Sequence, residues 1–412
     1  MAQVQTKFEV GGILLDRPFK VWRLGHFGFN VDKLDECVRF YTELLGFRIS
    51  DVLDFASVAS EPDKLAGLGD TRGYFTRYGT DHHAFVIFNR KVMEAMAQDR
   101  QRHFAPEVTI NQITWQVGSL SQVGNAINWF AERGIELQRS GRDMPGSNWH
   151  TYVYDPDGHT NELYYGIEQV GWDGYSKPRA LYKRGFREAP SLPQVSEFEE
   201  VRQALAEGVD LLSGYRYQDP LPATYDVEGI LLPRPFKITR IGPVNLFVRD
   251  VEAAKAFYQE IMGFTLTEAV EWQGHRCFFL RSNTEHHCLG LFPIALRQVL
   301  GLSDRTTCMS FGLQMANYRQ LRDAVSFLRD HGVRVETGLI PPELYPGIDY
   351  AAFAFDPEGH CLMLYYYMEQ LGWDGQPRPR ELRRKVNPGE WPQTLEPLSD
   401  TYKGESFMGP WA

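Results

Sequence analysis

The sequence predicts an α+β protein built from four βαβββ modules that pair into two similar halves. Two observations predict this class. A long segment of the chain recurs at a constant spacing, and within each copy the order strand, helix and three strands occurs twice. Self-similarity over this length indicates that one structural unit has been duplicated. We therefore expect each half to fold around its own sheet.

The repeat covers most of the chain. Residues 11–47 match residues 228–264, and the pairs Gly12/Gly229, Arg17/Arg234 and Phe47/Phe264 are each separated by 217 positions. Further matches are TDHHAFVIF with TEHHCLGLF, and YDPDGHTNELYYGIEQVGWDG (154–174) with FDPEGHCLMLYYYMEQLGWDG (355–375). We expect an N-terminal domain at 1–190, a helical linker at 191–224, a C-terminal domain at 225–375 and a tail at 376–412.

Local patterns predict the elements of the first half in order. Residues 21–31, VWRLGHFGFNV, are rich in β-branched and aromatic residues with near alternation, which predicts a strand. Residues 33–47 place their apolar side chains on one helical face and end at Gly46, as a C-cap does. Three short strands follow, and the second module repeats this order, with a strand at 108–117 and a helix at 121–134.

Composition excludes several functional classes. The hydrophobic fraction of 43% and the charged fraction of 23% are ordinary for a globular protein. A net charge of −10 argues against nucleic acid or an anionic membrane as the main partner. No apolar run reaches the roughly 18 residues of a membrane span, and the N-terminus lacks the pattern of a secretory signal. Five scattered cysteines without a CxxC pair favour reduced thiols in a cytoplasmic protein.

Paired βαβββ modules with Gly-Phe after the first helix and DPDGH…E near the end resemble the vicinal oxygen chelate superfamily. This group includes extradiol ring-cleaving dioxygenases, glyoxalase I, fosfomycin-resistance proteins and methylmalonyl-CoA epimerase. The resemblance covers residues 20–170 and 237–370, and the two-domain layout is most similar to type I extradiol dioxygenases. It implies that the two modules of each half curl into a half-open barrel around one metal. It also implies a homo-oligomer.

The resemblance places metal ligands on the first strand of each module and on the last strand of the second. The matching positions are His26, in LGHFGFNV, and Glu162, in DPDGHTNELYY. Where an extradiol enzyme has a second histidine, INQITWQV offers Gln112 as the third ligand. An imidazole and a carboxylate suit Fe(II) or Mn(II), and open coordination positions allow a diol and O₂ to bind together. The alternatives are a core histidine at position 26 and a solvent-facing glutamate at position 162.

Three further residues are candidates for catalysis. The resemblance places an acid–base histidine at His83, less favourably at His82, and histidine suits this role because its pKa lies near working pH. The pair recurs in the second half as His286-His287, so a structural role is an equal alternative. Tyr152 matches a tyrosine that donates to a substrate oxygen. A loop histidine of the family is absent, and His150 is either its replacement or a surface residue.

The second half serves as an internal control. Pro243, Ser310 and Met363 stand where the first half has His26, Gln112 and Glu162, and they cannot hold a catalytic metal. Residues that both halves share, such as Arg17 and Arg234, are expected to be structural.

The leading hypothesis is an Fe(II)-dependent extradiol-type dioxygenase that cleaves a small catechol-like aromatic diol with O₂. Aromatic residues near the predicted ligands are candidates for apolar walls, with core packing as the default: Phe27, Phe29, Phe85, Trp115 and Trp149. Gln112 favours one alternative, a divalent-metal isomerase or lyase of the glyoxalase or epimerase kind. The other alternative is a non-catalytic protein that binds a small molecule.

Overall fold

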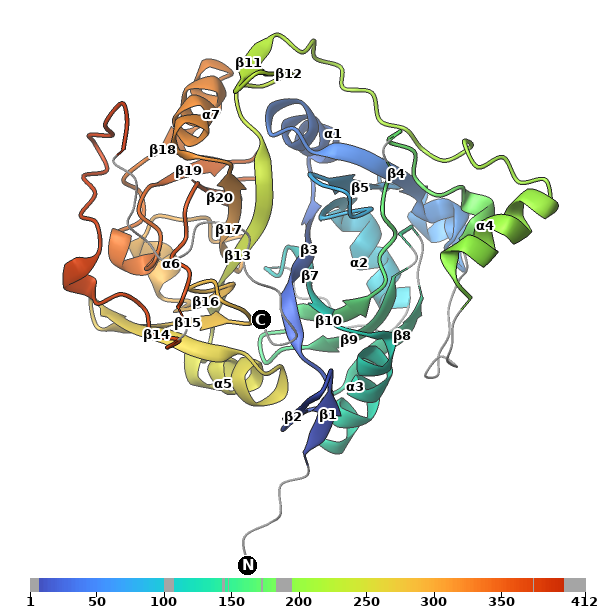
Figure 1. Ribbon diagram of the computed structural model, residues 1–412, viewed down its shortest axis with the longest axis horizontal. Helices are drawn as coiled ribbons and strands as arrows, with labels where there is room; N and C mark the ends of the chain where they lie inside the picture. Colours follow the sequence, from blue (N-terminus) through green and yellow to red (C-terminus); the bar gives the residue numbers. More distant parts are fainter. Residues whose placement is uncertain are drawn as a thin grey trace, which may run out of the picture.

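The computed structural model describes residues 7–99, 107–142, 145–146, 148–171, 173–182, 195–372 and 374–395. Each half of the chain forms one eight-stranded sheet, and the two halves lie side by side (Figure 1). The predicted α+β class and the four βαβββ modules are confirmed.

The first half begins with a short hairpin and continues with two modules. Its elements are β1 (Phe8–Val10), β2 (Ile13–Leu15), β3 (Val21–Val31), α1 (Leu34–Arg39), β4 (Arg48–Asp54), β5 (Arg72–Arg77), β6 (Phe85–Asn89), α2 (Arg90–Asp99), β7 (Ile110–Val117), α3 (Leu120–Glu132), β8 (Leu137–Arg142), β9 (Trp149–Tyr154) and β10 (Thr160–Tyr165). The helix α4 (Glu197–Ala206) follows between the halves.

The second half repeats this order. Its elements are β11 (Tyr225–Val227), β12 (Ile230–Leu232), β13 (Ile238–Val248), α5 (Val251–Ala256), β14 (Thr265–Trp272), β15 (His275–Arg281), β16 (Leu289–Pro293), α6 (Leu296–Val299), β17 (Cys308–Met315), α7 (Tyr318–Asp330), β18 (Val335–Glu336), β19 (Ala351–Phe355) and β20 (Cys361–Tyr365). The helices α1 and α5 each continue into a π-helical turn, at Phe40–Leu44 and Phe257–Ile261. The helical pattern at 33–47 did not predict this change of winding.

The first strands of the two modules lie at the centre of each sheet. In the first half the strand order is β4-β5-β6-β3-β7-β10-β9-β8. Strands β3 and β7 pair antiparallel, whereas β3 with β6 and β7 with β10 pair parallel. The second half has the equivalent order, from β14 to β18. Because β3, β7 and β10 are neighbours, side chains on one face of these strands converge.

The alternation along β3 separates two environments. Phe27 and Phe29 face the large core, which both halves share, and Phe27 stacks on Phe311 of the second half with ring centroids 4.2 Å apart. His26, directly before Phe27 in sequence, points to the opposite face, which we call the inner face of the sheet. The default of core packing is therefore confirmed for Phe27, Phe29, Phe85 and Trp115, which all belong to the shared core.

The DPDGH turn ties the first half to the second. Asp155 accepts hydrogen bonds from the ring of His159 at 2.8 Å and from the hydroxyl of Tyr258 at 3.0 Å. The other nitrogen of His159 contacts Thr307 Oγ1 at 2.8 Å. The equivalent turn of the second half makes the same contacts with the first half. Asp356 binds His360 and accepts from Tyr41, and His360 contacts Thr109.

The arginines shared by the repeats are also structural, as predicted. Arg234 donates to the backbone carbonyl of Glu43 at 2.9 Å, and Arg17 donates to that of Gly263 at 3.5 Å. Each arginine thus binds the end of the helix in the other half.

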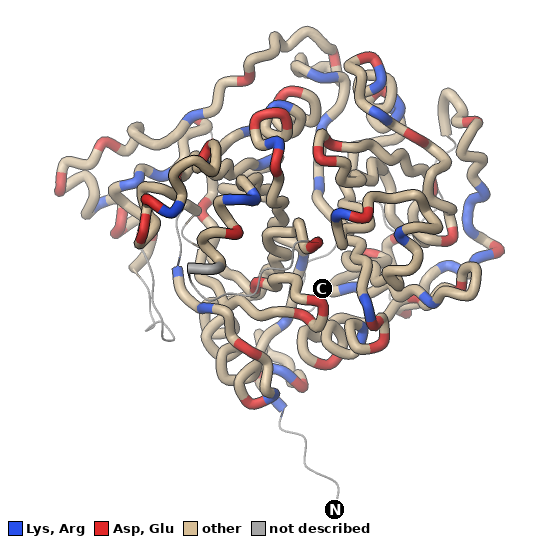
Figure 2. Tube along the Cα trace, turned by 180° about the vertical axis from the view of Figure 1, so that it is seen from behind, with Lys and Arg blue, Asp and Glu red and all other residues tan. Residues whose placement is uncertain are grey.

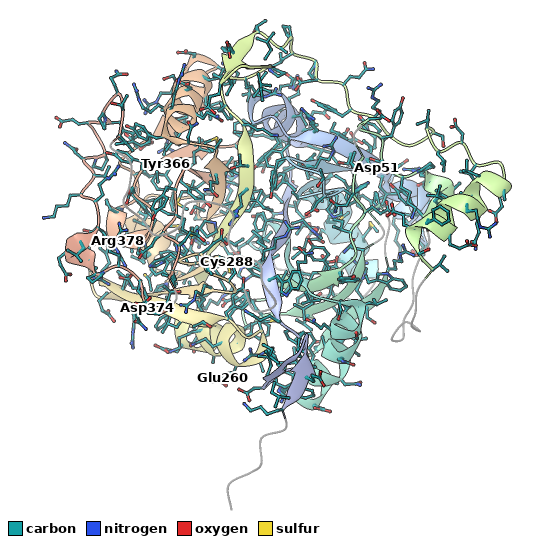
Figure 3. All side chains as sticks on the ribbon, viewed as in Figure 1. Asp51, Glu260, Cys288, Tyr366, Asp374 and Arg378 are labelled. Atoms are coloured by element: carbon teal, nitrogen blue, oxygen red, sulfur yellow. The ribbon has the colours of Figure 1, made fainter. Side chains whose placement is uncertain are left out.

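The charged residues and the cysteines are distributed as follows. Lys and Arg are interspersed with Asp and Glu around the molecule (Figure 2). All five cysteines are free, as predicted, and all are buried; Cys288 lies where the two halves meet (Figure 3). Within the described ranges, no helix has the length and hydropathy needed to cross a bilayer.

Candidate metal centre

Three neighbouring strands bring His26, Thr114 and Glu162 together on the inner face. In the β3–β7 ladder His26 is opposite Thr114, and in the β7–β10 ladder Thr114 is opposite Glu162. His26 Nε2 lies 3.0 Å from Glu162 Oε2, and Thr114 donates to the same oxygen at 2.8 Å. The two predicted residues that lie farthest apart in sequence are therefore in direct contact.

Glu162 is fully buried, with 0% of its surface exposed. Its second oxygen, Oε1, accepts from Asn148 Nδ2 at 2.7 Å. Burial alone would raise the pKa of this carboxyl group, but His26, His150 and the Thr114 hydroxyl outweigh burial and lower the pKa to about 2. Glu162 is thus an ionised carboxylate in the interior, and the alternative of a solvent-facing glutamate is wrong.

Gln112 lies two residues before Thr114, on the same inner face of β7. Its register partner on β3 is Gly28, so it is not directly opposite His26. The hydroxyl of Tyr152 donates to Gln112 Oε1 at 3.4 Å. Tyr152 is itself opposite Glu162 in the β9–β10 ladder. The tyrosine and the glutamine predicted as site residues therefore contact one another beside the carboxylate.

His150 is also buried, at 1% exposure, so the alternative of a surface residue is wrong. Its ring packs edge-on against Tyr152 with centroids 4.7 Å apart. Its Nδ1 lies 3.9 Å from Glu162 Oε1, beyond hydrogen-bond distance. His150 consequently belongs to the polar group around Glu162.

His83 lies against His26, with ring centroids 4.3 Å apart. Its Nδ1 is 3.2 Å from Nδ1 of His82, whose Nε2 is 3.3 Å from the hydroxyl of Tyr182. Burial lowers the pKa of His82 to about 3 and that of His83 well below its ordinary value, with further lowering by neighbouring His26 and, for His82, Arg77. Each ring therefore carries one proton at neutral pH.

The hydrogen bonds determine where these protons lie. Tyr182 donates its only hydroxyl proton to Asp51 at 2.6 Å, so its oxygen accepts from His82 Nε2. His82 Nδ1 then has a lone pair and accepts from His83 Nδ1. Nε2 of His83 is consequently the nitrogen with a lone pair, which is the form that a general base requires.

Two glycines beside His26 allow its neighbours to approach. A Cβ atom at Gly25 would lie 2.2 Å from the Tyr164 hydroxyl, and one at Gly28 would lie 2.1 Å from a Val86 methyl group. The Tyr164 ring packs against His26 with centroids 5.1 Å apart. The sequence LGHFG therefore encodes the close packing around the histidine as well as the histidine.

Sequence reasoning did not identify Thr114, Asn148 or Tyr164 as site residues. Thr114 is signalled only by its place two residues after Gln112 on an alternating strand. Asn148 lies in the loop before β9, where nothing in the sequence shows that its side chain reaches Glu162. Trp149, the remaining candidate wall, lies with its ring 5.0 Å from the Arg142 guanidinium.

The family model described as the Glyoxalase/Bleomycin resistance protein/Dioxygenase superfamily matches residues 23–163 and 240–364, one match in each half. The chain belongs to this superfamily. The vicinal oxygen chelate resemblance predicted from the repeats is thereby confirmed. No curated protein sequence matches the chain.

Solved structures show that the superfamily fold extends over nearly the whole chain. The 2,3-dioxygenase LapB from Pseudomonas sp. KL28 is 15% identical, with a TM-score of 0.54 over 87% of this chain and 96% of that chain. Homoprotocatechuate 2,3-dioxygenase from Arthrobacter globiformis is 15% identical, with a TM-score of 0.52 over 86% and 82%. The Mn(II)-bound glyoxalase from Novosphingobium aromaticivorans is 14% identical, with a TM-score of 0.52 over 86% and 85%. At these identities the likeness shows a shared fold.

The donor set on the inner face fits a hard or borderline divalent cation. Adjacent ligands of an octahedral ion with bonds of about 2.1 Å lie about 3 Å apart, and His26 Nε2 and Glu162 Oε2 are separated by 3.0 Å. Nδ1 of His26 has no hydrogen-bond partner among the described residues, so one ring nitrogen is open to a further ligand. Within the described chain, no three His, Cys, Asp or Glu side chains form a metal-binding group. The further oxygen atom that the structure places beside this pair is that of Gln112, which accepts from Tyr152.

The second half has replaced this polar group with an apolar cluster. Met363, the counterpart of Glu162, packs with Phe353, Tyr365 and Met368 in a hydrophobic cluster. Phe353 and Tyr365 are the counterparts of Tyr152 and Tyr164. The superfamily fold is thus kept in the second half, while apolar side chains stand where the first half has the polar group around Glu162.

Proposed function

We propose that the first half holds one Fe(II) ion through His26, Glu162 and Gln112, and that the protein cleaves a small catechol-like diol with O₂. The observation that carries this proposal is the contact of His26 with an ionised, fully buried Glu162 on the inner face of a superfamily barrel. The dioxygenases among the similar structures support the reaction class.

Each residue around the carboxylate has a role in the proposal. Thr114 and Asn148 each donate to a different oxygen of Glu162 and so fix its orientation. Tyr152 orients the carbonyl of Gln112, which is a better ligand than a neutral threonine hydroxyl because an amide oxygen carries more negative charge. The chemistry that a bound Fe(II) supplies is the chelation of a vicinal diol beside dioxygen.

His83 is the proposed base of the reaction. The lone pair on its Nε2 can accept a proton from a diol hydroxyl bound next to His26. His150, buried beside Tyr152, is proposed to hydrogen-bond the substrate. Burial of these groups excludes water from the proton transfer.

A second candidate is a divalent-metal isomerase or lyase. The Mn(II)-bound glyoxalase has the same TM-score as several of the dioxygenases, and a carboxylate with an amide ligand suits Mn(II) as well as Fe(II). In this reaction His83 would remove a proton next to a carbonyl group, and O₂ would not be consumed.

The test is metal analysis of anaerobically purified protein, followed by O₂ uptake with a panel of catechols. About one Fe(II) per chain with O₂ uptake and a ring-opened product would support the dioxygenase. Bound metal without O₂ uptake would favour the isomerase or lyase. Protein that holds no metal after incubation with Fe(II) or Mn(II) would contradict both and indicate a small-molecule binding protein.

A further inference from the structure

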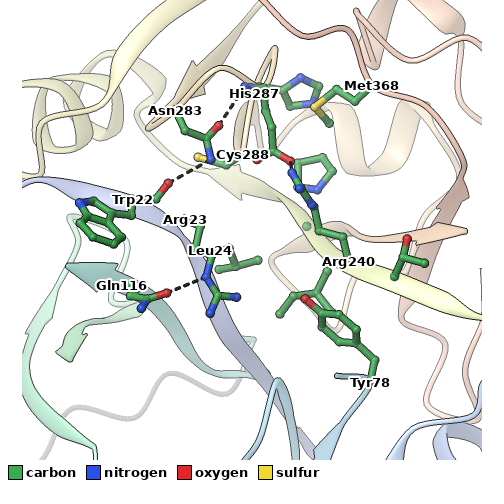
Figure 4. Close-up of a pocket in the computed structure, with 15 residues that line it drawn as sticks. Trp22, Arg23, Leu24, Tyr78, Gln116, Arg240, Asn283, His287, Cys288 and Met368 are labelled. Carbon is green, nitrogen blue, oxygen red and sulfur yellow. Dashed lines mark hydrogen bonds and ion pairs between the residues drawn. The ribbon is translucent and has the colours of Figure 1, made fainter. Parts of the chain in front are cut away.

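A cavity of about 410 Å³ lies between the two halves, on the side of the second half's inner face (Figure 4). Strands β3 and β13 supply most of its walls, and apolar side chains from both strands, Trp22, Leu24 and Ile241, line it. A volume of this size is within the range of small-molecule sites.

The cavity reaches the place where the second half has lost its metal ligands. Pro243, the counterpart of His26, and His287, the counterpart of His83, both line it. Met363, the counterpart of Glu162, is buried in the apolar cluster nearby. The second half has therefore kept the histidine of the inner face beside an open space while losing the carboxylate.

His287 lines this cavity and has one unused hydrogen-bonding atom. The side chain is fully buried, and its Nε2 has no hydrogen-bond partner among the described residues. Burial lowers the pKa of His287 well below its ordinary value, with further lowering by His286, so the ring is neutral. An unmet polar atom in the interior carries a free-energy cost, which a bound hydroxyl group would remove.

His287 is linked through His286 to the carboxylate of Glu268. Burial alone would raise the pKa of Glu268, but hydrogen bonds from His286 and Arg383 and the Arg380 guanidinium lower it to about 2, so it only accepts. His286 Nε2, 3.2 Å from that carboxylate, is a donor, and the two Nδ1 atoms of the His pair lie 3.1 Å apart. Because the His287 ring is neutral, one of its nitrogens donates and the other accepts, and a hydroxyl group can form a hydrogen bond with Nε2 in either form of the ring.

Two arginines supply donors to the same space. Arg23 and Arg240 reach it from β3 and β13 (Figure 4), and about a third of each side chain is exposed, at 33% and 32%. Arg23 binds Asp81 at 2.6 Å and Gln116 at 2.6 Å, and Arg240 binds Glu285. A guanidinium group has five N–H donors, so both arginines keep N–H groups for a further acceptor.

We propose that this cavity is a second, metal-independent ligand site that takes a small aromatic hydroxy acid. The hydroxyl group forms a hydrogen bond with His287 Nε2, the carboxylate accepts from Arg240 and Arg23, and the ring lies between the apolar walls that include Trp22 and Ile241. In the first half the ring of the equivalent histidine, His83, packs against that of His26 instead.

The probe is 4-hydroxybenzoate, which has no vicinal diol and so does not match the proposed metal centre. Isothermal titration of chelator-treated full-length protein is expected to show one site. Benzoate, which lacks the hydroxyl, and 4-hydroxybenzamide, which lacks the carboxylate, are each expected to bind about tenfold more weakly, the effect of losing one buried polar contact. No binding of 4-hydroxybenzoate at millimolar concentration would overturn the proposal.

Two variants assign the contacts within the site. His287→Phe is expected to weaken 4-hydroxybenzoate about tenfold and to bind it no better than benzoate. Arg240→Gln changes a partly exposed side chain, so it tests the site even if the buried His287→Phe variant does not fold. It is expected to bind 4-hydroxybenzoate no better than 4-hydroxybenzamide. The matched control is His83→Phe, the same change at the equivalent position of the first half, which is expected to bind the probe as the unaltered protein does. Loss of binding in His83→Phe with full binding in His287→Phe would place the probe in the first half and overturn the proposal.

Discussion

At the scale of single residues, the proposed chemistry depends on how an ionised carboxylate is kept in the interior. Glu162 is stabilised by an imidazole, a hydroxyl and an amide that come from three different segments. Removing one partner of a buried charge costs more than the contact itself is worth, because the charge then remains unpaired. Variants at this group therefore separate ligands from the residues that orient them.

Glu162→Ala is expected to abolish retention of Fe(II) or Mn(II) while the circular dichroism spectrum is unchanged. The reason is that the variant removes the only carboxylate bonded to His26 in the described chain. Metal content after gel filtration is the measurement. Full metal occupancy in the variant would show that the ion binds elsewhere.

Gln112→Leu and Thr114→Val test which neutral oxygen is the third ligand. We expect Gln112→Leu to lose metal at least tenfold more readily than Thr114→Val, which only frees the orientation of Glu162. Competition with a fluorescent chelator measures both affinities. The reverse ranking would assign the ligand to Thr114, which is opposite His26 in the ladder.

His83→Phe is expected to lower kcat by about two orders of magnitude without loss of metal, since a general base contributes roughly 10²–10⁴-fold. The measurement is turnover together with metal content. Tyr182→Phe offers a milder comparison, because it alters the proton arrangement of the His pair from a distance. Unchanged kinetics in His83→Phe would return His83 to the structural role that His286 and His287 suggest.

At the scale of elements, the segment after the last strand of each half folds back onto its first module. In the second half Arg383 binds Glu268 Oε2 at 2.6 Å and Arg380 binds Oε1 at 2.9 Å, which joins this segment to β14. In the first half the equivalent contact is Tyr182 with Asp51 on β4. One arrangement thus uses ion pairs and the other uses a neutral donor.

This difference predicts a pH-dependent contribution to stability from Glu268. Its pKa in the folded protein, about 2, is below the ordinary value of 4.5, so its contribution is complete above pH 4.5 and is lost as the pH falls toward 2. Urea unfolding should show Glu268→Gln less stable than the unaltered protein by on the order of 2 kcal/mol at pH 7, with a smaller difference at pH 3. Glu271→Gln, at an exposed position of the same strand, should show little difference at either pH. A constant difference for Glu268→Gln would contradict the assignment.

At the scale of the whole molecule, the two halves share one hydrophobic core and exchange hydrogen bonds. One hydrophobic cluster contains residues of both sheets, and each half donates a tyrosine hydroxyl to the other half's turn, Tyr41 to Asp356 and Tyr258 to Asp155, at 3.0 Å each. We therefore expect a single unfolding transition.

Tyr41→Phe and Tyr258→Phe each remove one of these contacts to a buried carboxylate. Each variant is expected to lower the free energy of unfolding by about 1–2 kcal/mol and to keep one transition. Tyr225→Phe, at a partly exposed position, is the control and should have little effect. Two separate transitions in thermal unfolding would show that the halves fold independently.

The sequence by itself was enough to predict the duplicated fold and two residues of the candidate site, His26 and Glu162. The repeat spacing of 217 residues can be found from the sequence alone. The same is true of the alternation of side chains along strands such as β3. His26 and Glu162 could be predicted because they lie at matching places of a recognised fold and are replaced in the other half.

Only the tertiary structure decided what surrounds His26 and Glu162. Strand register placed Thr114 opposite His26, loop geometry brought Asn148 to Glu162, and packing against the other half assigned Phe27 and Phe29 to the core. The cavity beside His287 likewise exists only where two distant strands meet. The physical reason is that register and packing depend on contacts between segments far apart in sequence, whereas alternation and repeats are local properties.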